Sequence, residues 1–409
     1  MKKTVFSDHI TVAIDIGTTK ICVLVAVGNG DSFEIIGVGK SPSDGLAKGV
    51  VVDINRTVES IKAAVREAEL MAQCKIEEAC IGISGGHIKS TSSQGMVPVK
   101  RGEIRASDIA QVVAAARAVA VPEGHQVLHV LPQYFIIDNQ EKIADPLGMY
   151  GVRLEAQVHI VTGSVASVHN LIKCCELAGI KVTDIVLEQL ASADAVLTYD
   201  EKKLGVLMID IGGGTSDVAL FYNNAIRHTM VLPVAGNHFT HDLAIGLRTT
   251  LNEAERIKKE VGAVEAVLGG SDFHEIVSIN GINKQIVAQK DIVAILFARA
   301  HELLSLVNKD LTAHSLQKMM GTGLVITGGG ALLKGMEKLA ESIFHVPVRI
   351  GNPNLLPHCV PILNNPMYAT GYGLILHALK KRDSTITRLA GPLVMRIMGR
   401  MKSWMTDFF

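Results

Sequence analysis

The chain has 409 residues, of which 48% are hydrophobic, and its 40 basic residues balance 40 acidic ones. A chain of this length and composition can bury a large core and exceeds the usual size of one domain, so we expect a globular protein of two or more domains. The balanced charge argues against nucleic acid as a partner.

The N-terminus and the cysteines favour a cytoplasmic protein. The first ten residues reach Ser7, Asp8 and His9 before any apolar segment long enough for a secretory signal. No stretch approaches the roughly 18 to 20 uncharged apolar residues of a spanning helix, so we expect any membrane contact to be peripheral. The six cysteines form no Cys-x-x-Cys pair, which favours buried thiols over disulfides or zinc.

The first predicted element is a strand, a tight turn and a second strand at residues 11–27, where the turn reads DIGTTK. Glycine allows backbone angles closed to other residues, so that N–H groups of the turn can point at phosphate oxygens. Asp15, at the end of the strand, is a candidate ligand of a hydrated Mg²⁺, which prefers carboxylate oxygens and water. The candidate phosphate-binding residues here are Gly17, Thr18, Thr19 and Lys20.

A Gly-x-Ser-x-Gly turn follows a predicted strand at residues 82–86, as in serine hydrolases. The helix that should come next is missing, because residues 87–100 are predicted to form loop and strand. This context favours a structural role for Ser84 over a catalytic one.

A second strand, glycine turn and strand are predicted at residues 205–222, where the turn reads DIGGGTSD. The Asp-Ile-Gly core shared with the first turn indicates an internal duplication. Asp210 has the same place in its turn as Asp15 and is the second candidate Mg²⁺ ligand. The candidate phosphate-binding residues here are Gly212, Gly213, Gly214 and Thr215.

Two pairs of side chains follow on predicted helices. His238 and His241 could share a helical face and bind a metal, but no further carboxylate or cysteine lies at ligand spacing, which favours structural or surface histidines. Glu255 and Lys258 lie three residues apart on one helical face. From spacing alone, they are either a ligand-binding pair or a solvated ion pair.

A third glycine turn ends the apolar strand within residues 323–334, where a helical pattern begins. A helix N-terminus there would favour an anion, or the ribose and base edge of a nucleotide, at Gly328, Gly329 and Gly330. Each turn alone could be a tight connection, but three in this order favour a nucleotide site. The chain lacks the P-loop motif and a strand-linked Gly-x-Gly-x-x-Gly, which argues against P-loop and Rossmann folds.

The end of the chain predicts a linker and an amphipathic helix. Residues 383–391 are polar, and Pro392 suits a first helical turn. From residue 393 the apolar side chains fall on one half of a helix, which is typical of a helix in a bilayer interface; packing onto the protein's own core is the alternative. The proposed membrane-contacting residues are Leu393, Ile397, Met401, Trp404, Met405 and Phe408, with Arg396 and Arg400 on the polar face.

The three turns, at residues 13–20, 208–217 and 325–335, resemble the motifs of the superfamily of actin, heat-shock chaperones and sugar kinases. The order of further segments, with the amphipathic C-terminus, resembles more closely the FtsA family of bacterial cell-division proteins. These segments are residues 81–88 (IGISGGHI), 187–197 (LEQLASADAVL) and 233–244 (PVAGNHFTHDLA). The resemblance implies an α/β, actin-like two-lobed ATPase fold with an inserted 1C subdomain and a C-terminal amphipathic helix.

The same resemblance implies the boundaries of the subdomains. They are 1–84, 163–203 and 367–382 for 1A; 85–162 for 1C; 204–236 and 321–366 for 2A; 237–320 for 2B; 383–391 for the linker; and 392–409 for the membrane-targeting helix.

The resemblance also assigns ATP and Mg²⁺ to a cleft between the lobes. Glu188 matches the acidic residue that positions the attacking water in relatives of this fold, and a helix-start cap is its alternative role. Glu255 and Lys258 resemble the superfamily's adenosine-contacting pair.

The implied function is that of a polymerising, ATP-binding protein with at most weak ATP hydrolysis, which tethers FtsZ filaments to the cytoplasmic face of the inner membrane at the division septum. Its implied partners are the FtsZ C-terminal peptide on 2B, later division proteins on 1C, other copies of the chain, and lipid at the C-terminal helix. The alternatives are a membrane-associated pilus-assembly actin homologue and a small-molecule kinase, since one fold hosts many functions.

Overall fold

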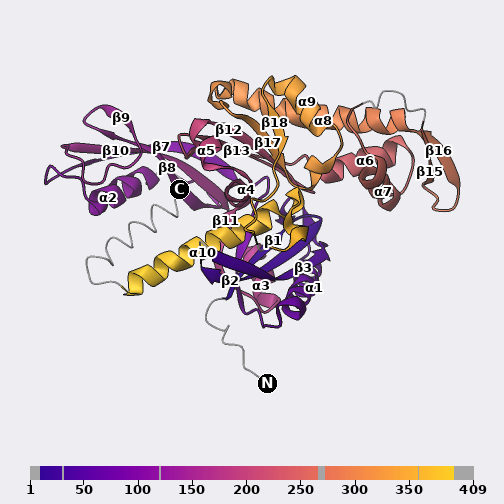
Figure 1. Cartoon of the computed structure of the whole chain (residues 1–409), viewed down its shortest axis with the longest axis horizontal. Coiled ribbons are helices and arrows are strands. Elements are labelled where there is room, and N and C mark those ends of the chain that lie inside the picture. Colours follow the sequence, from indigo (N-terminus) through magenta and orange to yellow (C-terminus); the bar gives the residue numbers. More distant parts are fainter. Residues whose placement is uncertain (1–9, 30–31, 119–120, 266–271, 358, 391–409) are drawn as a thin grey trace.

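A computed structural model of the chain describes residues 10–29, 32–118, 121–265, 272–357 and 359–390 (Figure 1). The predicted amphipathic helix at residues 392–409, with all its proposed membrane-contacting residues, lies outside this part of the chain. Among the described residues, no helix is both long enough and apolar enough to cross a bilayer.

The first lobe is built on a five-stranded sheet with the order β11-β6-β1-β2-β3. Its strands are β1 (Ile10–Ile16), β2 (Lys20–Asn29), β3 (Ser32–Pro42), β6 (Glu78–Ile83) and β11 (Lys181–Leu187), and the short pair β4 (Leu46–Ala47) and β5 (Val50–Val51) follows β3. Helices α1 (Ile54–Ala72) and α3 (Val165–Leu177) pack on each other and on this sheet. Helix α10 (Ala369–Ala390) packs on β1, β2 and β6.

The second lobe repeats this design. Its sheet has the order β14-β13-β12-β17-β18. As in the first sheet, the central strand, here β12, pairs antiparallel with the strand that follows it and parallel with its neighbour on the other side. This repeat confirms the internal duplication predicted from the two Asp-Ile-Gly turns. The strands are β12 (Val206–Ile211), β13 (Ser216–Tyr222), β14 (Ala225–Leu232), β17 (Gly323–Thr327) and β18 (Val348–Ile350).

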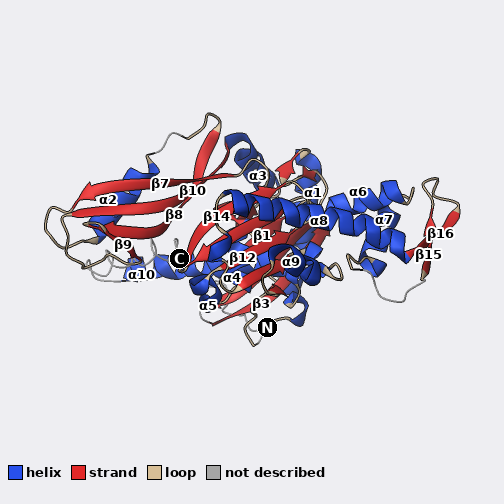
Figure 2. Cartoon of the chain, turned by 90° about the horizontal axis from the view of Figure 1, so that it is seen from above, coloured by secondary structure: helices blue, strands red, loops and turns tan. Residues whose placement is uncertain are grey.

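Several further helices and one hairpin complete the two lobes. They are α4 (Glu188–Val196), α5 (Tyr199–Leu204), α6 (Gly236–Gly246), α7 (Leu251–Val261), α8 (Gln289–Ala313) and α9 (Met336–Phe344), the hairpin β15 (Phe273–Val277) and β16 (Lys284–Ala288), and 3₁₀ helices at Gln317–Met319, Gly329–Leu332, Pro361–Leu363 and Pro366–Tyr368. The hairpin lies at one end of the long axis of the molecule (Figures 1 and 2).

An inserted subdomain occupies the other end of the long axis (Figure 2). It leaves the first lobe after β6 and returns through β10 into α3. It has its own four-stranded sheet, with the order β7-β10-β8-β9, and its own apolar core. Its elements are β7 (Lys89–Pro98), α2 (Ala106–Arg117), β8 (His125–Ile137), β9 (Gln140–Ile143) and β10 (Arg153–Ser164).

Helix α10 continues to Ala390, through most of the segment 383–391 for which the sequence predicts a linker. This segment is polar, but it contains no glycine or proline before Gly391 and Pro392. Since polar residues such as serine and threonine weaken a helix without stopping it, the helix can run on to these two breakers.

Helices α4 and α10 pack closely, and a glycine makes this possible. A Cβ atom placed on Gly373 of α10 would overlap the Ala191 carbonyl of α4. At Gly371, on the same helix, the nearest atom to such a Cβ would be Leu24 Cδ1 at 3.5 Å, an ordinary van der Waals contact.

We therefore expect opposite effects from the same substitution at two neighbouring positions. Gly373→Ala forces α10 away from α4 and should destabilise the protein by about 1–3 kcal/mol. Gly371→Ala should be neutral, or stabilising by up to about 1 kcal/mol, because alanine favours the helix. Thermal unfolding of the two full-length variants measures the difference, and equal melting temperatures would contradict the packing argument.

Candidate functional site

The first two glycine turns meet between the lobes. A Cβ atom on Gly213 would lie 2.5 Å from Thr19 Oγ1, and one on Gly214 would overlap the side chain of Thr18. A side chain at either position would therefore displace Thr18 or Thr19 of the first turn. The structure brings together the two phosphate-binding turns predicted from sequence.

Each turn is closed in the same way. The N–H of Gly17 donates to the Lys20 carbonyl at 3.0 Å, and the N–H of Gly212 donates to the Thr215 carbonyl at 2.9 Å. The second turn is also tied to the start of α6, where the Gly236 N–H donates to the Gly212 carbonyl at 3.0 Å. The equivalent closure supports the internal duplication at the level of single hydrogen bonds.

Buried carboxyl groups gather behind the two turns. Asp15 ends β1, Asp210 lies in β12, and Asp217 in β13 is the partner of Asp210 in the strand pair. Glu188, the first residue of α4, is partly buried, and its Oε1 would lie 3.3 Å from a Cβ atom on Gly82. These four residues come from different elements of both lobes.

Burial and mutual repulsion disfavour the charged forms of these groups. Burial raises the pKa of Asp15 to about 6; Lys20 opposes this shift and the charge of Asp210 adds to it. Burial likewise raises the pKa of Asp217 to about 7, against the hydrogen bond from Ser84. Burial, followed by the charges of Asp15 and Asp217, raises the pKa of Glu188 well above its usual range.

Three hydroxyl groups hold the aspartates in place. Ser192 Oγ donates to Asp210 Oδ2 at 2.6 Å, and Thr370 Oγ1 donates to the same oxygen at 3.2 Å. Ser84 Oγ donates to Asp217 Oδ1 at 2.5 Å, so this serine holds a carboxyl group in place. Sequence reasoning assigned no site role to Ser192, Thr370 or Asp217, although Ser192 and Asp217 lie inside the segments 187–197 and 208–217 that carry the resemblance.

Lys20 lies near the carboxyl groups but donates elsewhere. Its Nζ lies 2.5 Å from the Met367 carbonyl and 4.7 Å from the centre of the Tyr368 ring. Its charge nevertheless opposes the upward pKa shifts of Asp15 and Asp210.

Glu255 and Lys258 form a pair beside the second turn. Lys258 Nζ lies 2.6 Å from Glu255 Oε2, and it donates to Thr240 Oγ1 at 2.8 Å and to the Gly236 carbonyl at 3.0 Å. The Lys258 side chain is only 12% exposed, so this is not a freely solvated ion pair. Burial lowers the pKa of Lys258, whereas the Lys258 and Thr240 hydrogen bonds hold the pKa of Glu255 below its usual range despite burial.

The third glycine turn lies against the end of β12. Gly328 has φ +81°, and a Cβ atom there would overlap Asp210 Oδ1. A Cβ atom on Gly330 would overlap the Ile211 side chain. Gly329 is different, because it is exposed and no atom would lie within 4 Å of its Cβ.

The arrangement can hold an anion and a cation together. Backbone N–H groups of the glycine turns and the hydroxyls of Thr18, Thr19 and Thr215 suit phosphate oxygens. The buried carboxyl groups suit a hydrated divalent cation, which would offset their repulsion. The residues present therefore fit a magnesium-bound nucleotide.

The two candidate histidines lie in α6, whose first residues hydrogen-bond to the second turn. His241 Nδ1 contacts the Asn237 carbonyl at 2.7 Å, and His238 Nδ1 accepts from the Ala235 N–H at 3.2 Å, so both histidines have local partners. Two cavities, of about 510 and 430 Å³, adjoin α8, and no residue predicted from sequence to bind nucleotide lines either of them.

Sequence comparison finds relatives over nearly the whole chain. A family model described as "Cell division protein FtsA" matches residues 207–373, and one described as "SHS2 domain inserted in FTSA" matches residues 85–162. The chain is 42% identical to the cell division protein FtsA of Pseudomonas aeruginosa, with 99% of this chain and 100% of the relative covered. It is 35% identical to that of Escherichia coli, with 98% of each covered.

Structural comparison finds the same fold in distant proteins. A PilM–PilN type IV pilus biogenesis complex matches with a TM-score of 0.66 and 18% identity, over 90% of this chain and 98% of that chain. MreB5 of Spiroplasma citri bound to ADP matches with a TM-score of 0.56 and 17% identity, over 90% of this chain and 95% of that chain. Together with the inserted SHS2 domain, these similarities confirm the predicted actin-like α/β fold.

We expect Asp217→Asn to change how stability depends on pH. The folded protein keeps the Asp217 proton up to about pH 7, whereas an unfolded chain releases it near 3.8, so ionisation destabilises the fold as the pH rises through this window. Asparagine does not ionise, so the variant does not lose stability in this pH range. The free energy of unfolding of the variant minus that of the unchanged chain should therefore increase by a few kcal/mol as the pH rises, at about 1.4 kcal/mol per pH unit.

Urea unfolding at pH 5 and pH 8, without nucleotide or divalent cations, measures this difference. A difference in stability that stays constant between the two pH values would contradict the buried, repelling environment of Asp217.

Proposed function

The chain belongs to the FtsA family of cell division proteins, and from this we propose that it is an actin-like, ATP-binding adaptor that tethers FtsZ filaments to the cytoplasmic membrane at the division septum. The proposal rests on one observation above all. The two glycine turns meet over a group of buried carboxyl groups, in a chain that is 35% to 42% identical to FtsA proteins over nearly its full length.

In this proposal ATP lies across the junction of the turns. Gly17, Thr18 and Thr19 hold the phosphates from the first lobe, and Gly212 to Thr215 hold them from the second. Bound Mg²⁺ would supply positive charge between the phosphates and the carboxylates of Asp15 and Asp210. The open position at Gly329 and the buried Glu255–Lys258 pair mark the direction in which the adenosine extends.

We assign Glu188 to the orientation of the attacking water. It lies at the start of α4, beside the carboxyl groups, but its raised pKa favours the neutral form in the free protein. A neutral carboxyl group is a poor base, so hydrolysis would be slow until a cation lowers that pKa. This is consistent with a nucleotide-dependent switch that has weak ATPase activity.

We propose that the FtsZ C-terminal peptide binds to subdomain 2B, residues 237–320, beside α8. Helix α8 adjoins both cavities, and Ala294 lines each of them. Phe297, also in the lining of the larger cavity, is 43% exposed and would be covered by an apolar side chain of a bound peptide.

The other contacts are assigned to the remaining parts of the chain. Later division proteins bind subdomain 1C, residues 85–162, and copies of the chain polymerise. The C-terminal helix, residues 392–409, lies in the bilayer interface. A single helix of this length binds lipid reversibly, so polymerisation would strengthen the attachment by presenting many helices together. Pilus assembly is the less favoured alternative, because the PilM–PilN similarity extends to the fold alone, at 18% identity.

We expect Gly329→Ala to weaken ATP binding at least tenfold without changing the thermal stability of the free protein. The added methyl group meets no atom of the protein within 4 Å, so a loss of affinity would mean that the methyl group collides with bound ATP.

We expect a different effect from Asp210→Asn. This variant keeps the size of the side chain and its contacts with Ser192 and Thr370 but removes the charge, and it should abolish the Mg²⁺ dependence of ATP binding.

Anisotropy of a fluorescent ATP analogue, with and without Mg²⁺, measures both effects. Unchanged affinity in Gly329→Ala would contradict the place given to the adenosine, and unchanged Mg²⁺ dependence in Asp210→Asn would contradict the cation site.

We expect the full chain to carry a fluorescent FtsZ C-terminal peptide into the pellet with anionic vesicles. A chain without residues 393–409, or with Trp404→Glu, should still bind the peptide in solution but leave it in the supernatant. Ser403→Glu adds the same charge on the polar face and is the matched control, which should retain pelleting. Pelleting of the peptide by the Trp404→Glu chain would contradict the membrane anchor.

A further inference from the structure

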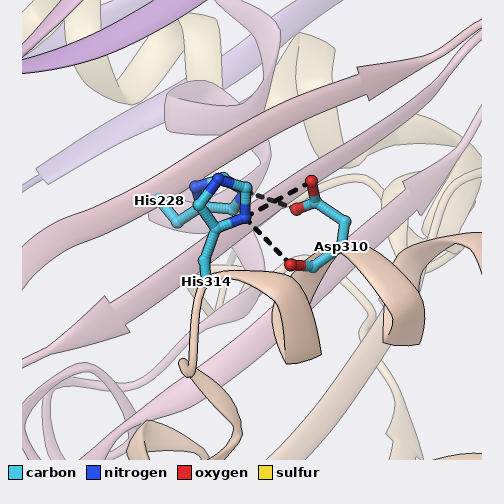
Figure 3. A group of neighbouring side chains, drawn as sticks. All are labelled: His228, Asp310 and His314. Carbon is cyan, nitrogen blue, oxygen red and sulfur yellow. Dashed lines mark hydrogen bonds and ion pairs between the residues drawn. The ribbon is translucent and has the colours of Figure 1, made fainter.

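A second group of metal-binding side chains lies outside the cleft, where β14 approaches the end of α8. His228 comes from β14, Asp310 from the last turn of α8, and His314 caps that helix (Figure 3). His228 Nε2 lies 2.6 Å from Asp310 Oδ2, and His314 Nδ1 lies 3.5 Å from Asp310 Oδ1. The centres of the two imidazole rings are 4.9 Å apart.

We propose that His228, Asp310 and His314 bind one divalent transition-metal ion of the zinc class. Two imidazoles and one carboxylate suit Zn²⁺, Co²⁺ or Ni²⁺, whereas Mg²⁺ prefers oxygen ligands only. Three protein ligands also leave a position for water. This site is therefore distinct in chemistry from the carboxyl groups of Asp15 and Asp210.

The spacing of the donor atoms is close to what such an ion requires. One ligand atom from each residue lies within 4.8 Å of the other two. Ligands about 2.0–2.1 Å from a tetrahedral metal lie about 3.3 Å from each other. His228 Nε2 and Asp310 Oδ2, now 2.6 Å apart, must therefore separate, whereas His314 must move closer to them around the ion. His314 Nδ1 donates to the Asp310 backbone carbonyl at 2.9 Å, so the ring must give up this bond to bind the ion. The His314 side chain is 55% exposed, which leaves room for this turn and leaves the ion a path from solvent.

A neighbouring buried histidine, His159, does not oppose a cation at this site. His159 lies close enough for the charge of His228 to affect its ionisation, but burial is the main cause that lowers the pKa of His159 to about 4. His159 is therefore neutral at physiological pH. Its Nε2 contacts Thr229 Oγ1 at 2.8 Å, which fixes its ring beside β14.

A bound ion would fasten two elements that are far apart in sequence. It would link β14, the edge strand of the second sheet, to the end of α8, 82 residues further along the chain. Because the unfolded chain does not hold these donors together, binding stabilises the fold.

Titration of the metal-free full chain with Co²⁺, in excess Mg²⁺, tests the proposal. We expect the visible absorption of tetrahedral or five-coordinate Co²⁺ to saturate at one equivalent and to be displaced by Zn²⁺. Zn²⁺ should also raise the melting temperature by several degrees.

Asp310→Asn keeps a hydrogen-bond acceptor for His228 but removes the anionic ligand, and His314→Gln removes the imidazole from an exposed position. Both should lose the signal and the Zn²⁺ stabilisation. His301→Gln removes another exposed histidine of α8 and should retain both. Absence of one-equivalent Co²⁺ binding in the unchanged chain, or binding that survives in Asp310→Asn and His314→Gln, would overturn the proposal.

Discussion

Repulsion among buried carboxyl groups is the constraint on which the rest of the structure depends. Burial raises the pKa values of Asp15, Glu188 and Asp217, and the nearby charge of Asp210 raises each of them further. In the free protein, protons relieve this repulsion, and a divalent cation would displace them. Binding of such a cation would therefore release protons from groups that both lobes supply.

Hydrogen bonds at this point cross from one lobe to the other. Ser84 follows β6 of the first lobe and donates to Asp217 of the second. Thr370, at the start of α10, donates to Asp210 at the end of β12, and so does Ser192 of α4. A rotation of one lobe against the other must break or redirect these bonds, so the charge state of the aspartates and the angle between the lobes are physically coupled.

The sequence predicted the glycine turns of this site, because the residues of a turn are close together in the chain. Glycine is needed wherever the backbone passes close to another group, as at Gly214 against Thr18, and such positions appear as motifs. Sequence did not predict the partner of Lys20, which donates to a carbonyl 347 residues away, nor the joining of His228 to Asp310. Those contacts depend on tertiary packing, for which no local pattern exists. The extent of α10 was missed for a related reason, since polar composition suggested a linker where no residue stops the helix.

The inserted subdomain is held by the edge of the second sheet as well as by its own lobe. Gln133 Nε2 donates to the carbonyl of Ile226 at 2.9 Å, and Ser90 Oγ donates to that of Thr229 at 3.1 Å. An exposed edge strand invites pairing with another chain, and these side chains occupy carbonyl groups of β14 that would otherwise be free to pair. The insertion is covalently part of the first lobe, so these bonds make a second bridge between the lobes, remote from the carboxyl groups. A change in the angle between the lobes must therefore also shift the insertion along β14 or strain the bonds that hold it.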